Sequence, residues 1–246
     1  MLSSVKAMPQ EVLGLVLARA GSKSVPRKNI HLVLGKPLIA YTIEPAHAAR
    51  SITRVVVTTD DPEIADLARG LGAEVPFLRP SELAQDETPD YPVVRHALEW
   101  LEAKDGYRPD LIVQLRPTSP LRTSRHLDEA IALLRARPDA DSVRGVCRPH
   151  QNPHKMWRMT SDGLLSPLLA VPGVPEPFNS PRQTLPVVWW QNGYIDVFWR
   201  RTVFEQESLT GAKVLGYVID EPEHVDIDSL HDIRVLELIL RNRQAP

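Results

Sequence analysis

Short apolar runs recur along the chain and alternate with segments whose apolar positions follow a helical period. Residues 12–18 form a continuous apolar run of strand length, which is typical of a parallel strand covered on both faces. Residues 54–59 and 110–115 repeat this pattern. Apolar residues at helical spacing are found at 62–71, 90–103 and 124–137. This alternation predicts an α/β fold with a doubly wound, mainly parallel sheet.

The pattern changes in the second half of the chain. An apolar run at 142–147 predicts a further strand, but residues 148–186 are rich in proline and have no sustained period. Because a structureless loop of this length is unusual in a compact domain, we expect a small inserted subdomain or a long arm here. Strand patterns resume at 193–199 and 213–219, and an apolar stripe within 229–242 predicts a closing helix.

Composition narrows the class of protein. The 246 residues are 43% hydrophobic, which is enough to bury the core of one domain spanning 1–246. Because 29 basic residues stand against 31 acidic ones, no overall basic field is available for nucleic acid or a membrane surface. The apolar runs are shorter than the ~20 residues of a membrane helix. Cys147 is the single cysteine, so we expect a cytoplasmic protein in which this thiol is buried and structural.

The segment that follows the first predicted strand carries the clearest chemistry. Residues 18–29 contain four cations, two serines and Gly21. In open α/β sheets ligands bind at the carboxyl ends of the strands, so this loop has the composition to cradle a polyphosphate. It contains neither the Walker pattern nor the dinucleotide-binding glycine pattern. A solvated basic turn is the alternative interpretation.

This loop resembles the signature loop of the acylneuraminate cytidylyltransferases, the CMP-sialic acid synthetase family. The matching residues are Arg19, Ser22, Lys23, Lys28 and Asn29. Leu17 stands where the family has proline, and Ser24 stands where it has glycine. Since serine adopts a positive φ less readily than glycine, the Ser24 change could alter the conformation of the loop.

The resemblance continues along nearly the whole chain. Residues 78–84 resemble the second family motif, whose arginine, here Arg79, lies near the nucleotide. Residues 117–122 resemble the third motif, which lies near the sugar and here contains Thr118 and Ser119. Residues 181–186 followed by Asn192-Gly193 resemble the family's arm and its return, and residues 226–228 resemble its metal motif.

The resemblance implies a Rossmann-like nucleotidyltransferase fold and a specific reaction. Such an enzyme joins CMP from CTP to an acidic, nine-carbon, sialic-acid-like sugar and releases pyrophosphate. It also implies a homodimer, in which an inserted dimerisation arm, here residues 148–192, reaches the neighbour's site. On this arm Lys155, Arg182 and Gln183 are the expected substrate-binding residues.

Asp226 and Asp228 are the expected metal ligands. If residues 225–228 are extended, both carboxylates lie on one face and Ile227 enters the core. Two carboxylates suit Mg²⁺ or Mn²⁺, because such an ion completes its shell with phosphate oxygens and water. The alternative is that Asp228 is the N-cap of the last helix.

Two further positions leave alternatives open. Arg116 stands where sialic-acid enzymes usually carry glutamine, and it could bind an anionic group of the sugar or pair with a neighbouring Asp or Glu. Asp90 stands where the family contacts the base, and it could accept from cytosine, accept from guanine, or cap the helix that follows.

The resemblance also assigns roles in the reaction. Arg19 and Lys23 would neutralise the phosphates together with the metal on Asp226 and Asp228, while Asn29 and Arg79 would orient the nucleoside. The rival interpretations are a nucleotidyltransferase of the same fold that uses another acid sugar or GTP, and a catalytically silent nucleotide-binding dimer.

Overall fold

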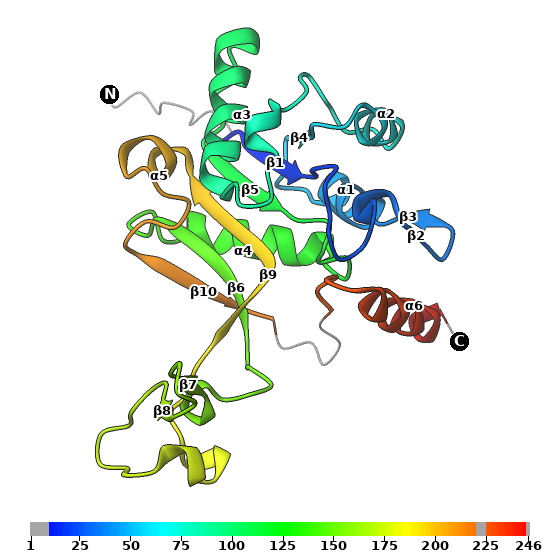
Figure 1. The fold of residues 1–246 in the computed structure, drawn as a ribbon. Coiled ribbons are helices and arrows are strands. Elements are labelled where there is room, and N and C mark those ends of the chain that lie inside the picture. Colours follow the sequence, from blue (N-terminus) through cyan, green and yellow to red (C-terminus); the bar gives the residue numbers. More distant parts are fainter. Residues whose placement is uncertain (1–9, 220–224, 245–246) are drawn as a thin grey trace, which may run out of the picture.

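A six-stranded sheet forms the centre of the computed structural model, which describes residues 10–219 and 225–244 (Figure 1). The strand order is β10-β6-β9-β5-β1-β4. Only β9 runs antiparallel to its neighbours within this sheet, so the expected mainly parallel sheet is confirmed. The strands are β1 (Val12–Leu17), β4 (Arg54–Thr58), β5 (Leu111–Leu115), β6 (Ser142–Cys147), β9 (Trp190–Trp199) and β10 (Val214–Val218).

Helices cover both faces of the sheet, as the doubly wound arrangement requires. One apolar cluster includes residues of α1, α2, α4 and α6, and a second cluster includes residues of α3 and α5 on the opposite face. The helices are α1 (Ala40–Ala48), α2 (Pro62–Gly70), α3 (Asp90–Asp105), α4 (Ser124–Arg135), α5 (Arg200–Glu205) and α6 (Leu230–Gln244).

Local sequence signals explain which of these helices could be predicted. Asp61 caps α2, since its Oδ1 accepts from the backbone of Glu63 at 2.7 Å, and Gly72 follows with φ of +88°. The helix α1 was not expected, because it contains Pro45 and has no side-chain cap. A small antiparallel pair, β2 (Leu32–Val33) and β3 (Lys36–Pro37), precedes α1.

Residues 148–192, which we call the arm, leave the sheet between β6 and β9. Figure 1 shows most of this segment projecting away from the sheet, below β6 and β9. It contains a short antiparallel pair, β7 (Trp157–Met159) and β8 (Leu165–Pro167). Its last three residues already belong to β9, because Trp190 and Gln191 pair with β6. The dimerisation role of the arm stays a prediction.

Cys147 lies at the end of β6 and is buried, as expected of a structural thiol. Within the described ranges, none of the helices has the length and apolar character needed to cross a bilayer.

Candidate active site

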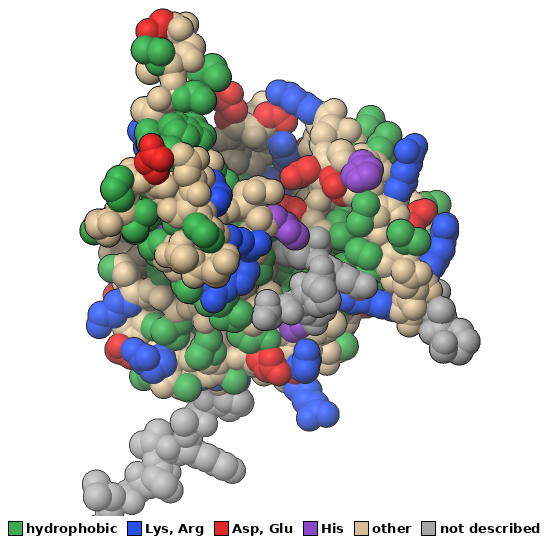
Figure 2. Space-filling view, turned by 90° about the horizontal axis from the view of Figure 1, so that it is seen from below, with side chains coloured by type: hydrophobic (Ala, Val, Ile, Leu, Met, Phe, Trp, Pro, Cys, Tyr) green, Lys and Arg blue, Asp and Glu red, His purple; other side chains and the backbone are tan. Residues whose placement is uncertain are grey.

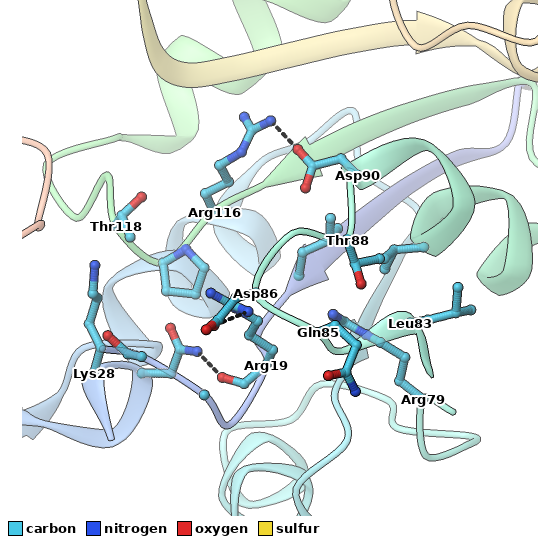
Figure 3. Close-up of a pocket in the computed structure, with 16 residues that line it drawn as sticks. Arg19, Lys28, Arg79, Leu83, Gln85, Asp86, Thr88, Asp90, Arg116 and Thr118 are labelled. Carbon is cyan, nitrogen blue, oxygen red and sulfur yellow. Dashed lines mark hydrogen bonds and ion pairs between the residues drawn. The ribbon is translucent and has the colours of Figure 1, made fainter. Parts of the chain in front are cut away.

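A cavity of about 320 Å³ opens at the carboxyl ends of β1 and β5 (Figure 3). Three segments line it: the loop after β1, the stretch that leads into α3, and the residues that follow β5. Eight of the residues predicted for the site are among those that line it: Arg19, Ser22, Lys28, Asn29, Arg79, Asp90, Arg116 and Thr118. The strand-end location predicted for the basic loop is therefore confirmed.

Hydrogen bonds hold the basic loop in a fixed course. Asn29 donates from Nδ2 to the carbonyl oxygen of Arg19 at 2.8 Å, and the backbone amide of Ala20 donates to Asp60 Oδ1 at 2.9 Å. Arg27 adopts the left-handed conformation, with φ of +56°, whereas Ser24 does not. The serine that replaces the family's glycine therefore introduces no backbone strain at position 24.

Asp86 occupies the cationic end of the cavity. Its carboxylate pairs with Arg19 Nη1 at 2.9 Å and with Lys23 Nζ at 2.6 Å. The hydrogen bond from Lys23 holds the pKa of the Asp86 carboxyl below its usual range. Lys23 is 84% exposed and does not itself line the cavity. A phosphate that binds these two cations would take over the position of the Asp86 carboxylate.

Arg79 lies at the other end of the cavity, near Leu83 (Figure 3). It is 6% exposed, and it donates from Nε to Thr58 Oγ1 at 3.1 Å and from Nη2 to the Thr58 carbonyl at 2.6 Å. Burial lowers the pKa of Arg79 to about 10, which still leaves it protonated at neutral pH. This end therefore offers a fixed cationic donor beside the apolar side chain of Leu83, and Leu17 and Val93 also line the cavity.

Asp90 and Arg116 form one ion pair on the cavity wall. Asp90 Oδ2 accepts from Arg116 Nη2 at 2.5 Å and from Gln114 Nε2 at 2.7 Å. Asp90 does not cap α3, because the N-cap is Pro89 and no side-chain cap bond is formed there. The helix-cap interpretation of Asp90 is therefore wrong, while the interpretation of Arg116 as the partner of a neighbouring carboxylate is confirmed.

Arg116 has a second carboxylate partner. Its Nη1 lies 2.6 Å from Asp196 Oδ2. Burial alone would lower the pKa of Arg116, but the charges of Asp196 and Asp90 outweigh burial and raise it. Both terminal nitrogens of Arg116 are thus occupied, which argues against Arg116 as the main anchor for an anionic group of the sugar.

The predicted metal motif lies at the Lys28 and Thr118 end of the cavity. The backbone amide of Ile227 donates to the Thr118 carbonyl at 2.9 Å, and Lys28 Nζ donates to the Ile227 carbonyl at 2.5 Å. Lys28 Nζ also lies 3.5 Å from Asp228 Oδ1. Ile227 is fully buried, as predicted, while Asp226 is half-buried and Asp228 is exposed.

The cap of α6 does not involve the side chain of Asp228. Ser229 Oγ accepts from the backbone amide of Asp232 at 3.4 Å, and Asp232 Oδ2 accepts from the backbone amide of Ser229 at 2.7 Å. This reciprocal pair is a capping box. The interpretation of Asp228 as a helix cap is therefore wrong, and its carboxylate is available for another role.

The carboxylates at this end suit a divalent ion whose remaining coordination positions are filled by a substrate. Throughout the described ranges, no group of three His, Cys, Asp or Glu side chains could enclose a metal by itself. Mg²⁺ takes one or two carboxylates and fills the remaining positions with phosphate oxygens and water. Asp226 and Asp228 supply two such carboxylates on one short segment beside the cavity.

The remaining residues of the third motif have different surroundings. Ser119 is fully buried and does not line the cavity, whereas Thr118 does. Arg122 is 2% exposed and donates to the Tyr194 carbonyl at 2.5 Å and to the Arg116 carbonyl at 3.1 Å. It thereby ties the loop after β5 to β9 and fixes the position of Thr118.

The predicted arm residues lie outside this cavity. Lys155, Arg182 and Gln183 are all exposed, and Arg182 donates to the Pro149 carbonyl at 2.8 Å. Arg182 and Gln183 line a separate cavity of about 350 Å³ within the arm. Within a single chain these three residues are therefore not brought together with the phosphate loop.

Sequence reasoning missed three residues of this region: Asp86, Gln114 and Asp196. Asp86 and Gln114 are near the matched motifs in the sequence, but no local pattern indicates their partners. Asp196 is 80 residues from Arg116, and only the pairing of β5 with β9 brings them together.

A family model described as cytidylyltransferase matches residues 13–159, which is more than half of the 246 residues. The chain belongs to the cytidylyltransferase family. The matched region includes the basic loop, Arg79, Asp90 and the residues after β5, and all the residues that line the cavity lie within it.

Individual relatives agree with this membership. N-acylneuraminate cytidylyltransferase of Escherichia coli is 28% identical over 239 residues, which cover 96% of this chain and 54% of that enzyme. The chain thus spans about half the length of that relative. CMP-N,N'-diacetyllegionaminic acid synthase of Campylobacter jejuni is 29% identical over 233 residues, which cover 94% of this chain and 95% of that enzyme.

A solved structure shows the shared cytidylyltransferase fold. The structure of a CMP:2-keto-3-deoxy-manno-octonic acid synthetase complexed with CTP matches this chain with a TM-score of 0.69 at 15% identity. The match covers 95% of this chain and 99% of that one. The expected nucleotidyltransferase sheet is therefore confirmed.

Proposed function

We propose that this cytidylyltransferase joins CMP from CTP to an acidic nonulosonic sugar and releases pyrophosphate. The observation that carries the proposal is the division of one cavity into two chemically different ends. One end is cationic, with Arg19, Lys28 and the adjacent Lys23, and the other places a buried arginine and a carboxylate beside apolar side chains. This division suits a triphosphate at one end and a base at the other.

The base end complements cytosine. Arg79 is a fixed donor that suits the ring acceptors of cytosine, and Asp90 is an acceptor that suits its amino group. The relatives support the choice of both substrates, because their names specify CMP linkage to N-acylneuraminate or to N,N'-diacetyllegionaminic acid. The presence of Arg116 in place of glutamine leaves the individual sugar open.

The reaction requires charge neutralisation and positioning more than a protein nucleophile. The anomeric hydroxyl of the sugar would attack the α-phosphate, form the new oxygen–phosphorus bond and displace pyrophosphate, while the hydroxyl proton is lost to solvent. Arg19, Lys23 and Lys28 would hold the phosphates after Asp86 is displaced. Asp226 and Asp228 would hold Mg²⁺ or Mn²⁺, and such an ion supplies further neutralisation of the departing charge.

We infer that the active form is a homodimer. The arm exposes large apolar side chains, among them Met159 at 71% and Trp189 at 47%. Figure 2, which views the molecule from the side of the arm, shows hydrophobic side chains exposed on this face among polar and basic ones. A second copy of the chain would cover these side chains and bring Lys155 and Arg182 toward its neighbour's cavity.

The single cysteine supports a cytoplasmic setting.

A competition assay tests the nucleotide and the activity together. CTP, GTP, UTP and ATP are offered at equal concentration with a panel of nonulosonic acids, and pyrophosphate and the CMP-sugar are measured. We expect CTP to be consumed at least about tenfold faster than any other nucleotide.

Two outcomes would contradict the proposal. If GTP is consumed faster than CTP by about tenfold, the cytidylyl assignment is wrong, and Asp90→Ser should then shift preference back toward CTP. If CTP binds but no acid sugar supports release of pyrophosphate, the chain is a silent nucleotide-binding protein.

A further inference from the structure

A row of polar and charged side chains crosses the sheet beside the cavity. Gln114 on β5, Asp196 on β9 and Arg144 on β6 are register partners, so they lie side by side on one face. Asp196 is 1% exposed, and its two oxygens contact different arginines: Oδ2 lies 2.6 Å from Arg116 Nη1, and Oδ1 lies 2.7 Å from Arg144 Nη1. The reaction outlined above makes no use of Asp196 or Arg144.

This arrangement is hard to explain by stability alone. Moving a carboxylate and two guanidinium groups out of water has a large desolvation penalty, and apolar replacements of buried ion pairs are often neutral or stabilising. Buried charges of this kind can instead fix one specific geometry. The geometry fixed here is that of Arg116, whose remaining terminal nitrogen holds Asp90.

The contacts of Asp90 are unequal between its two oxygens. In the described part of the chain, its hydrogen bonds from Gln114 and Arg116 both end on Oδ2. Figure 3 shows one Asp90 oxygen directed at Arg116 and the other directed toward the interior of the cavity. A bound base would therefore meet a single oriented carboxylate acceptor from Asp90.

We propose that Asp196 is a positioning residue for nucleotide choice: it holds Arg116, and Arg116 orients Asp90 so that one carboxylate oxygen faces the base. The proposal rests on the proposed use of CTP. Cytosine presents one amino group to such an acceptor. Uracil presents a carbonyl oxygen, which the carboxylate repels, and the two-donor edge of guanine would need both oxygens of Asp90.

The test is the ratio of kcat/KM for CTP to that for UTP with one accepted sugar. We expect the native chain to favour CTP by about a hundredfold or more. Asp196→Asn removes the charge that holds Arg116, so the ratio should fall by about tenfold or more, with kcat/KM for CTP reduced and that for UTP retained or raised. Arg116→Lys should give the same fall, because a lysine cannot bridge two carboxylates in this way.

Asp141→Asn is the matched control. Asp141 is also a buried carboxylate next to β6, but it accepts from Gln206 and from the backbone amides of Ala212 and Lys213, away from the cavity. This variant should lower the unfolding midpoint and leave the CTP to UTP ratio unchanged.

The possible results distinguish a failure of this inference from a failure of the proposed function. If Asp196→Asn and Arg116→Lys lower activity toward CTP and UTP equally, Asp196 is only structural and the inference is overturned. A native chain that uses CTP and UTP equally well would overturn it too. A native chain that uses no CTP would instead contradict the proposed function. Should Asp196→Asn fail to fold, Arg116→Lys decides the question alone.

Discussion

Replacement of Asp228 by asparagine is expected to slow turnover by about a hundredfold to a thousandfold while the fold is retained. The reason lies in the surroundings of its carboxylate. The side chain is 79% exposed, it takes no part in the cap of α6, and its Oδ1 lies 3.5 Å from Lys28 Nζ. Loss of its charge would therefore remove one of the two proposed metal ligands and little packing.

Release of pyrophosphate at several Mg²⁺ concentrations, together with an unfolding midpoint, measures this effect. Ser229→Ala is the matched control, because it removes part of the adjacent capping box. It should reduce the free energy of unfolding by about 1 kcal/mol and leave most of the turnover. Full activity of Asp228→Asn, or of the native chain in excess chelator, would show that this motif binds no essential metal.

The fold was largely predictable because its strands are continuous apolar runs bounded by clear breaks. The exceptions have local causes. Pro45 inside α1 and the absence of a cap hide that helix, and α5 is too short to show a period. The early start of β9 at Trp190 depends on pairing with β6 across the arm, which no local pattern reveals.

The parts of the site whose residues lie close together in the sequence were predictable. The basic loop comes directly after β1, so the topology alone places Arg19 and Lys28 at the strand ends. The partners of Arg116 depend on strand register instead, and the sequence could therefore offer the pairing only as an alternative. The role of Asp228 was ambiguous for a similar reason, since the competing cap by Ser229 and Asp232 appears only in the folded chain.

A mixture of two inactive variants is expected to regain activity if the arm completes a neighbour's site. Lys23→Ala damages the phosphate end of the cavity, and Arg182→Ala damages the arm, which lies apart from the cavity of its own chain. In an equal mixture about half of the dimers are mixed, and each of these holds one intact site out of two, so about a quarter of native activity should return.

The control for this mixture pairs Lys23→Ala with Arg19→Ala. Both residues contact Asp86 at the same end of the cavity, so every site in that mixture stays damaged and no activity should return. Subunit exchange is followed separately with two affinity tags. If exchange is complete and the mixture of Lys23→Ala with Arg182→Ala stays as inactive as this control, each chain works with its own residues alone, and the composite site is wrong. Recovery confined to the first mixture would instead assign Arg182 to the cavity of the partner chain.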